Sequence, residues 1–232
     1  MSAMESDAAV PSALRTPRAA GIAGVLFALL LTVALVLIRL AAPPEASDAA
    51  EWLADPGRTR QVVLALNLVP FAGIAFLWFI GVMRNRIGQH EDQFFATVFL
   101  GSGLLFIAML FVASAVTAGY LAVARSGAAG GGEGLGRKVG AVVLHTYAMR
   151  MAAVFTISTT TIGLRTGFLP RWLGFLGYAI APILLLVIDF TRWVELLFPF
   201  WILLLGLDTL VESFGGTGRD KGHTPPAPAP TG

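Results

Sequence analysis

The chain has 232 residues, of which 56% are hydrophobic and only 13% are charged. Soluble domains carry about 25% charged residues, and a water-soluble fold of this size could not cover so much apolar surface. The lack of cysteine excludes disulfides, Cys-ligated zinc and iron–sulfur clusters. A formal net charge of +2 without a basic patch argues against nucleic-acid binding. The composition therefore predicts an all-α integral membrane protein.

Apolar stretches of membrane-spanning length recur along the whole chain. A spanning helix needs roughly 20 apolar residues, and such stretches occupy residues 19–40, 61–83, 93–124, 139–164, 172–189 and 193–211. They predict a polytopic transmembrane helix bundle with about six spans. The tails at 1–18 and 214–232 are predicted to be disordered, and the second is rich in proline. A cleaved signal peptide is the alternative for the first stretch, but its apolar run exceeds the ~7–15 residues of such signals.

The connecting segments carry turn signals. Residues 43–60 are predicted to form a polar loop that turns at Asp55-Pro56-Gly57, with a short interfacial helix over 46–54. The glycine-rich segment 125–138 is predicted to be a flexible loop. Between the fourth and fifth spans, Gly167 suits the position just after a helix and Pro170 suits the first turn of the next.

Small residues at four-residue spacing predict where helices approach each other, because helices in lipid associate through close packing. The predicted ridges are Ala20, Gly24 and Ala28; Ser114, Ala115, Ala118 and Gly119; Ala148, Ala152, Thr156 and Thr160; and Gly177 and Ala181. Pro70, Pro182 and Pro199 lie inside the second, fifth and sixth spans and predict kinks.

Arg150 is the most unusual residue of the predicted spans. It lies between Lys138 and Arg165 and so near the predicted bilayer midplane, where an arginine costs roughly 2.5 to 3.5 kcal/mol. We expect it to face the bundle and to have an acceptor there. A structural ion pair or carbonyl clamp and a substrate or anion site both stay open as its role.

A buried polar cluster around Arg150 is the candidate site. Its predicted members are Arg150, His145, Asn67, Asp189, Glu195 and Asp208. His145 is the only histidine inside a predicted span, so a haem held by two histidines is excluded. It suits either a proton relay or a hydrogen-bonded structural position.

Enzymatic motifs are weak in this chain. Ser102 lies between two glycines, and with His145 it suggests a serine–histidine catalytic pair. Helix packing through small residues explains the Gly-Ser-Gly triplet more simply. His90-Glu91-Asp92 lacks metal-ligand spacing and reads as a solvated loop before an acidic first turn. We predict no enzymatic activity, no cofactor and no bound metal.

Residues 145–177 carry a family resemblance. His145 opens the segment, and the run from Gly167 to Gly174 reads Gly-Phe-Leu-Pro-Arg-Trp-Leu-Gly. This pattern is similar to the C-terminal half of uncharacterised bacterial multi-pass membrane proteins, classified only as a domain of unknown function. The resemblance implies the topology and no activity, and Arg150 is not part of its pattern.

The sequence therefore favours a structural or accessory subunit, multi-pass in the bacterial plasma (inner) membrane. The alternative is a small transporter or a proton or ion pathway centred on Arg150 and His145. The expected partners are the lipid bilayer and either other membrane proteins or a second copy of the chain, with no nucleic acid. Nearly equal numbers of basic residues on the two sides leave orientation weakly determined, and the short basic loops favour cytoplasmic termini.

Overall fold

The computed structural model describes residues 17–41, 55–87, 93–126, 133–186 and 193–215, and all regular structure within these ranges is helical. The elements are α1 (Pro17–Ala41), α3 (Pro56–Ile87), α4 (Gln93–Arg125), α5 (Glu133–Val142), the π-helical segment η2 (Val143–Ala148), α6 (Met149–Thr166), α7 (Arg171–Leu186), the 3₁₀ turn η3 (Val194–Leu196) and α8 (Leu197–Gly215). The predicted all-α helix bundle is confirmed.

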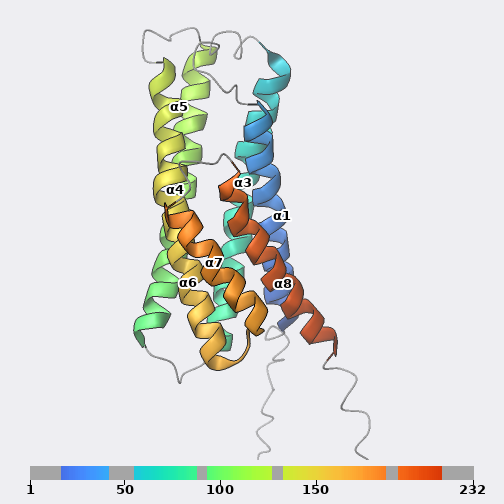
Figure 1. Cartoon of the computed structure of the whole chain (residues 1–232). Coiled ribbons are helices and arrows are strands. Elements are labelled where there is room, and N and C mark those ends of the chain that lie inside the picture. The colour runs from blue at the N-terminus through green and yellow to red at the C-terminus, as the bar shows by residue number, and fades with distance from the viewer. Residues whose placement is uncertain (1–16, 42–54, 88–92, 127–132, 187–192, 216–232) are drawn as a thin grey trace, which may run out of the picture.

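The helices run up and down in an elongated bundle (Figure 1). α1 packs against α3 and α8, α4 packs against α3, α5 and α6, and α7 packs against α6. α5, η2 and α6 follow one another without a break and form one long rod. α7 and α8 cover only the lower part of the bundle, while α5 and the neighbouring ends of α3 and α4 extend above them (Figure 1).

Both described ends of the chain lie at the same end of the bundle (Figure 1). A guanidinium nitrogen of Arg18 donates to the carbonyl oxygen of Ser213 over 3.5 Å, which joins the start of α1 to the last turn of α8. This placement agrees with an even number of crossings. Which end faces the cytoplasm stays a prediction.

Five helical stretches of the described chain are long and apolar enough to cross a membrane, namely Arg18–Ala41, Pro56–Arg84, Phe94–Arg125, Lys138–Thr166 and Val194–Ser213. α7 is shorter, with 16 residues, or about 24 Å of helix against the ~30 Å of a bilayer core. The predicted fifth span ends at residue 189, and its last residues lie outside the described ranges.

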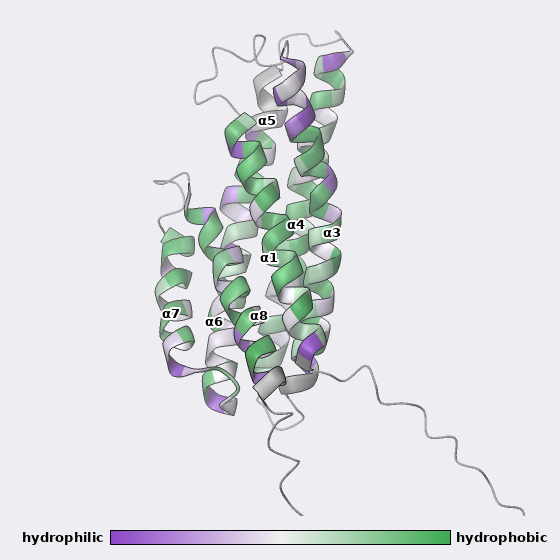
Figure 2. Ribbon diagram, turned by 90° about the vertical axis from the view of Figure 1, so that its right-hand side faces the viewer, coloured by the Kyte–Doolittle hydropathy of each residue, from purple (hydrophilic) through white to green (hydrophobic). Residues whose placement is uncertain are grey.

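The surface of the bundle is apolar. Trp78, Phe175 and Leu186 are each about 70% exposed, and many other large apolar side chains are also exposed. Green, the colour of hydrophobic residues, predominates along the helices in Figure 2. An apolar patch of this extent is unfavourable in water and suits a lipid environment. The chain therefore has the features of a membrane protein with transmembrane helices.

Phenylalanines fill the centre of the bundle. Phe27, Phe76, Phe106, Phe155 and Phe198 are fully buried and come from α1, α3, α4, α6 and α8 in turn. Their ring centroids lie 4.4 to 6.2 Å apart, which is the range of favourable aromatic pairs. One cluster of rings thus holds five helices together.

Three of the four predicted small-residue ridges are buried contacts. Ala148, Ala152, Thr156 and Thr160 on η2 and α6 are all fully buried. A Cβ on Gly177 of α7 would collide with the hydroxyl of Thr160, so these two ridges interlock. On the first ridge, Gly24 of α1 approaches Phe79 and Gly206.

The ridge predicted late in the third span was wrong. Ala115, Ala118 and Gly119 of α4 are exposed, and a Cβ on Gly119 would meet nothing within 4 Å. Gly140 of α5 instead approaches α4 at Thr117 and Ala113. The contact lies on a neighbouring face of α4, because α5 continues the fourth span upward and packs there.

Two predicted loops are partly helical. α3 begins at Pro56, because the Asp55 carboxylate accepts hydrogen bonds from the backbone N–H groups of Gly57 (2.8 Å) and Arg58 (3.4 Å) and so caps the helix. α5 begins at Glu133, inside the predicted glycine-rich loop. The tails and the predicted helix over 46–54 lie outside the described residues.

The turn between α6 and α7 forms as predicted, whereas one proline lies nearer a helix end than predicted. Gly167 has φ 76°, the left-handed conformation that ends a helix, as predicted. Pro170 directly precedes α7, also as predicted. Pro199 lies in the first turn of α8 and not, as predicted, deep inside a span. Backbone N–H groups in the first turn have no acceptor within the helix, so a proline there breaks no helical hydrogen bond.

The contact between α6 and α7 gives a stability prediction. Gly177→Val should lower the free energy of unfolding by about 1 to 3 kcal/mol, because the added side chain overpacks the contact with Thr160 and Trp201. Gly119→Val is the control, since its site is open. Unfolding of both purified variants in detergent measures the difference. Equal stability of the two would contradict this packing.

Candidate functional site

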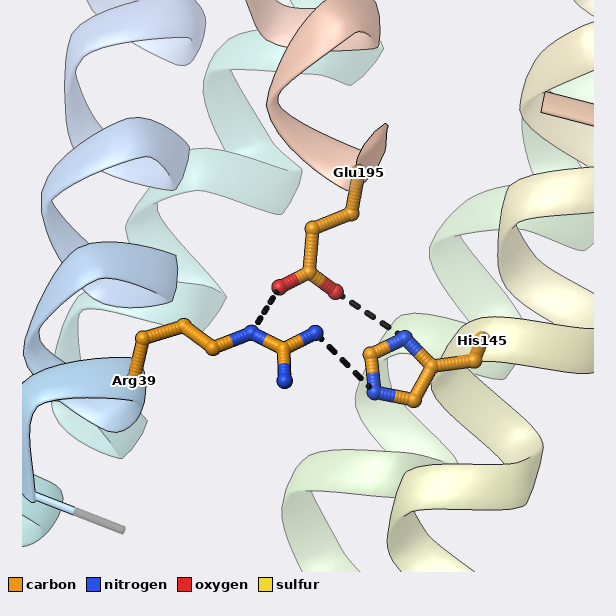
Figure 3. Close-up of polar contacts among 3 residues, drawn as sticks. All are labelled: Arg39, His145 and Glu195. Carbon is orange, nitrogen blue, oxygen red and sulfur yellow. Dashed lines mark hydrogen bonds and ion pairs between the residues drawn. The ribbon is translucent and has the colours of Figure 1, made fainter. Parts of the chain in front are cut away.

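Three ionisable side chains from distant parts of the chain meet inside the bundle. Arg39 lies in the last turn of α1, His145 lies in η2, and Glu195 lies in η3 at the tip of the α7–α8 hairpin. Helical side chains tilt toward the N-terminus of their helix, so Arg39 reaches back into the bundle. Figure 3 shows the three side chains pointing toward one another. We call this group the Arg-Glu-His cluster.

Short polar contacts join all three members. Arg39 donates a hydrogen bond from Nε to Glu195 Oε1 over 2.7 Å. Glu195 Oε2 lies 3.0 Å from His145 Nδ1. Arg39 Nη2 lies 3.4 Å from His145 Nε2 (Figure 3). The carboxylate thus contacts the guanidinium and the imidazole at once.

The contact between Arg39 and His145 favours one form of the histidine. A guanidinium can only donate hydrogen bonds, so His145 Nε2 must act as the acceptor toward Arg39 Nη2. A neutral imidazole then carries its proton on Nδ1, the nitrogen that faces Glu195. The cluster therefore fits a neutral Nδ1–H histidine between a carboxylate and a guanidinium.

Glu195 is the most buried member, with a side chain only 3% exposed, against 19% for Arg39 and 25% for His145. Its Oε2 makes the close contact with Nδ1 but receives no well-aligned hydrogen bond from a described residue. The imidazole N–H direction therefore misses Oε2 despite the 3.0 Å separation. One buried carboxylate oxygen therefore keeps unused acceptor capacity.

A cavity of about 310 Å³ lies against the Arg-Glu-His cluster. We call it the vestibule. It is bounded by α1, α3, α4, α5 and η2, through Leu31, Ala34, Leu35, Ile38, Leu66, Val69, Leu110, Ala113, Ser114, Thr117, Lys138, Gly140, Ala141 and Leu144, together with the three cluster residues. Most of this lining is apolar. Glu195, in η3 just before α8, is the only residue of the α7–α8 part of the described chain that lines the vestibule.

The structure brings together two of the six predicted cluster residues, His145 and Glu195. Asp208 lies on α8, 13 residues after Glu195 and about 20 Å further along the helix. Asn67 is exposed on α3 and lines a different hollow, against α4. The prediction that these two join His145 was wrong, because Asp208 lies too far along α8 and Asn67 lies at another hollow of α3. Asp189 lies outside the described residues.

Arg150, the predicted centre of the site, is half-buried on α6. It forms no hydrogen bond or ion pair with any other residue in the described part of the chain. The acceptor predicted for it is thus not found among those residues. Arg39 takes the predicted role of the arginine beside His145.

Ser102 does not act as a partner of His145. Its hydroxyl is buried and donates to the carbonyl oxygens of Val98 (2.7 Å) and Phe99 (3.2 Å) on its own helix. His145 instead contacts Arg39 and Glu195. The weak serine–histidine motif is therefore explained by helix packing. His90-Glu91-Asp92 lies outside the described residues.

No protein-family model matches the chain, and neither does any curated protein or solved structure. A function must therefore be argued from the cluster and the vestibule.

The cluster predicts strong coupling between the buried Glu195 carboxylate and the partly buried Arg39 guanidinium. Arg39→Met or Glu195→Leu alone should lower the free energy of unfolding by about 3 to 5 kcal/mol, because each leaves an unpaired buried charge. The double variant should lose less free energy of unfolding than the two single variants lose together. Unfolding of the purified variants in detergent measures these losses. Arg58→Met is the control, since the Arg58–Asp55 pair is about half exposed and should cost less than about 1 kcal/mol. Additive losses at Arg39 and Glu195 would show that the pair is not coupled.

Proposed function

We propose that the protein is a non-enzymatic, multi-pass protein of the bacterial plasma membrane. It binds a small amphipathic anion and acts as a small transporter or as a binding subunit. The observation that carries this proposal is the vestibule, an apolar cavity that ends at the Arg-Glu-His cluster. Ionisable groups inside a membrane-spanning bundle are costly and usually mark a functional site. The bacterial location rests on the similarity of residues 145–177 to bacterial multi-pass proteins.

The size and lining of the vestibule support a small apolar or amphipathic ligand. Its volume of about 310 Å³ lies at the lower end of the ~300–1,000 Å³ of typical ligand pockets. Leu31, Leu35 and Leu110 line its apolar part. Few polar groups in an apolar pocket orient a ligand and provide specificity, which is the arrangement seen here.

The charges support an anionic head group. Arg39 and Lys138 line the vestibule with Glu195 as the one acidic residue among its lining residues. Two cations against one carboxylate leave one positive charge in excess. A guanidinium has five N–H donors, and Arg39 Nη1 forms no hydrogen bond with a described residue. A carboxylate or phosphate ligand could accept from this nitrogen without displacing Glu195.

A purely structural role in an accessory subunit is the second candidate. Its support is the near-complete burial of Glu195, whose contacts tie α1, η2 and the α7–α8 hairpin together. In that case the vestibule would hold bulk lipid without preference, and the protein would act through its apolar outer surface on a membrane partner.

Photo-crosslinking in liposomes separates these candidates. A medium-chain fatty acid carrying a diazirine is the probe, and crosslinked peptides are mapped by mass spectrometry. We expect labelling to concentrate on the α1 and α4 segments that line the vestibule. Ser114→Phe should reduce this labelling at least several-fold by filling the cavity, because Ser114 lines it.

Ala115→Phe is the matched control, because Ala115 is exposed on the adjacent position of α4 and does not line the vestibule. It should leave the labelling unchanged. Labelling spread evenly over the exposed apolar side chains, and equal in both variants, would refute the binding proposal and favour the structural role.

A further inference from the structure

A second hollow lies between α3 and α4. It consists of two adjoining pockets that share Val63 and Arg125, with volumes of about 350 Å³ and 140 Å³. The outer pocket is lined by Pro56, Thr59, Arg60, Val63 and Arg125. The inner one is lined by Val63, Leu66, Asn67, Ala118, Leu121, Ala122 and Arg125. We call the two together the α3–α4 groove.

The outer end of the groove is cationic. Arg60 and Arg125 line the same pocket from α3 and α4. Both are exposed, and neither forms an ion pair or a hydrogen bond with another described residue. Asp55, the acidic residue at the start of α3, is already bound by Arg58 (3.2 Å) and by the backbone of Gly57. Two arginines thus face a hollow without a protein counter-ion in the described chain.

The inner end of the groove is apolar except for one amide. Val63, Leu66, Leu121 and two alanines form its walls. Asn67 is exposed there and forms no hydrogen bond with a described residue. An amide that faces lipid without a partner is unfavourable, so Asn67 suits a ligand that brings a polar group below its charged head.

The groove lies at the level where α1 ends. Ala41, at the end of α1, packs in one small cluster with Val62 and Leu121. Arg60 lies about 3 Å and Arg125 about 6 Å beyond that cluster along their helices. The head-group layer on each side of the ~30 Å hydrocarbon core is roughly 5 to 7 Å thick. If α1 ends at the edge of the core, the two arginines lie among the head groups.

We infer that the α3–α4 groove binds an anionic phospholipid from the surrounding leaflet. Arg60 and Arg125 hold the phosphate through charge-assisted hydrogen bonds. The glycerol backbone and the first part of one acyl chain lie along Val63, Leu66 and Leu121. Asn67 donates to an ester carbonyl of the glycerol backbone. This site is separate from the Arg-Glu-His cluster and does not depend on what the vestibule binds.

Native mass spectrometry of the full chain in mild detergent tests the site. Titration with phosphatidylglycerol should show one tight binding event that phosphatidylcholine does not reproduce. The double variant Arg60→Gln/Arg125→Gln should bind phosphatidylglycerol about 30-fold more weakly, as expected for two surface charges lost. Arg84→Gln is the control, because Arg84 is exposed at the other end of α3, and it should bind as the unchanged chain does.

Two further measurements keep the outcome decisive. The unfolding temperature without lipid should be the same for the double variant and the unchanged chain, and Arg60→Lys/Arg125→Lys should keep most of the affinity. Equal affinity for the two lipids, or equal losses in the Arg84→Gln control, would overturn the proposal. So would inorganic phosphate that competes fully with the lipid, because the groove would then recognise a free anion.

Discussion

The burial of the Glu195 carboxylate is the constraint on which the upper half of the bundle depends. A carboxylate that is 3% exposed is stable only beside compensating groups, and here these are Arg39 and His145. They come from the end of α1 and from η2, so the cluster fixes three parts of the chain against one another. The π-helical segment is part of this arrangement. The backbone N–H of Met149, which directly follows η2, donates a hydrogen bond to the carbonyl oxygen of Leu144, five residues earlier. Such widened helical turns often occur at functional sites.

The two halves of the bundle are built on different principles. The lower half is closely packed, with a cluster of phenylalanine rings and interlocking small residues such as Thr160 and Gly177. α7 and α8 do not extend along the upper half, because α7 ends at Leu186 and η3 begins at Val194 partway along the bundle (Figure 1). The space left above the hairpin is the vestibule, and the cluster forms its polar end. Leu66 of α3 lines both the vestibule and the α3–α4 groove, so one side chain borders both hollows.

Hydropathy predicted most of the fold. Every predicted span contains a helix, because the need to satisfy backbone groups in lipid leaves helices as the available structure for such segments. The errors lie at the ends. The start of α3 depends on a local cap by Asp55, and α5 continues a span into a glycine-rich segment that composition alone marks as flexible. The exposed ridge on α4 shows that small residues predict close packing only where a partner helix passes.

The candidate site was predicted in part. His145 and Glu195 stand out as polar groups in apolar surroundings, and the structure joins them. Arg39 was missed because a basic residue at the end of an apolar run looks like an ordinary boundary of a span. It lies 156 residues from Glu195, and no periodicity links two such positions. Arg150 was selected because its position within a predicted span places it near the bilayer midplane. That position does not show which face of the helix the residue occupies or which residues lie opposite.

Solid-state NMR of the ¹⁵N-labelled protein in lipid bilayers tests the Arg-Glu-His cluster most directly. The ring nitrogens of His145, assigned by comparison with His145→Asn, report which nitrogen carries the proton. We expect a neutral ring with the proton on Nδ1, an unprotonated Nε2, and a through-space contact from Nδ1 to the Glu195 carboxylate. A proton on Nε2, or the absence of any contact with Glu195, would contradict it.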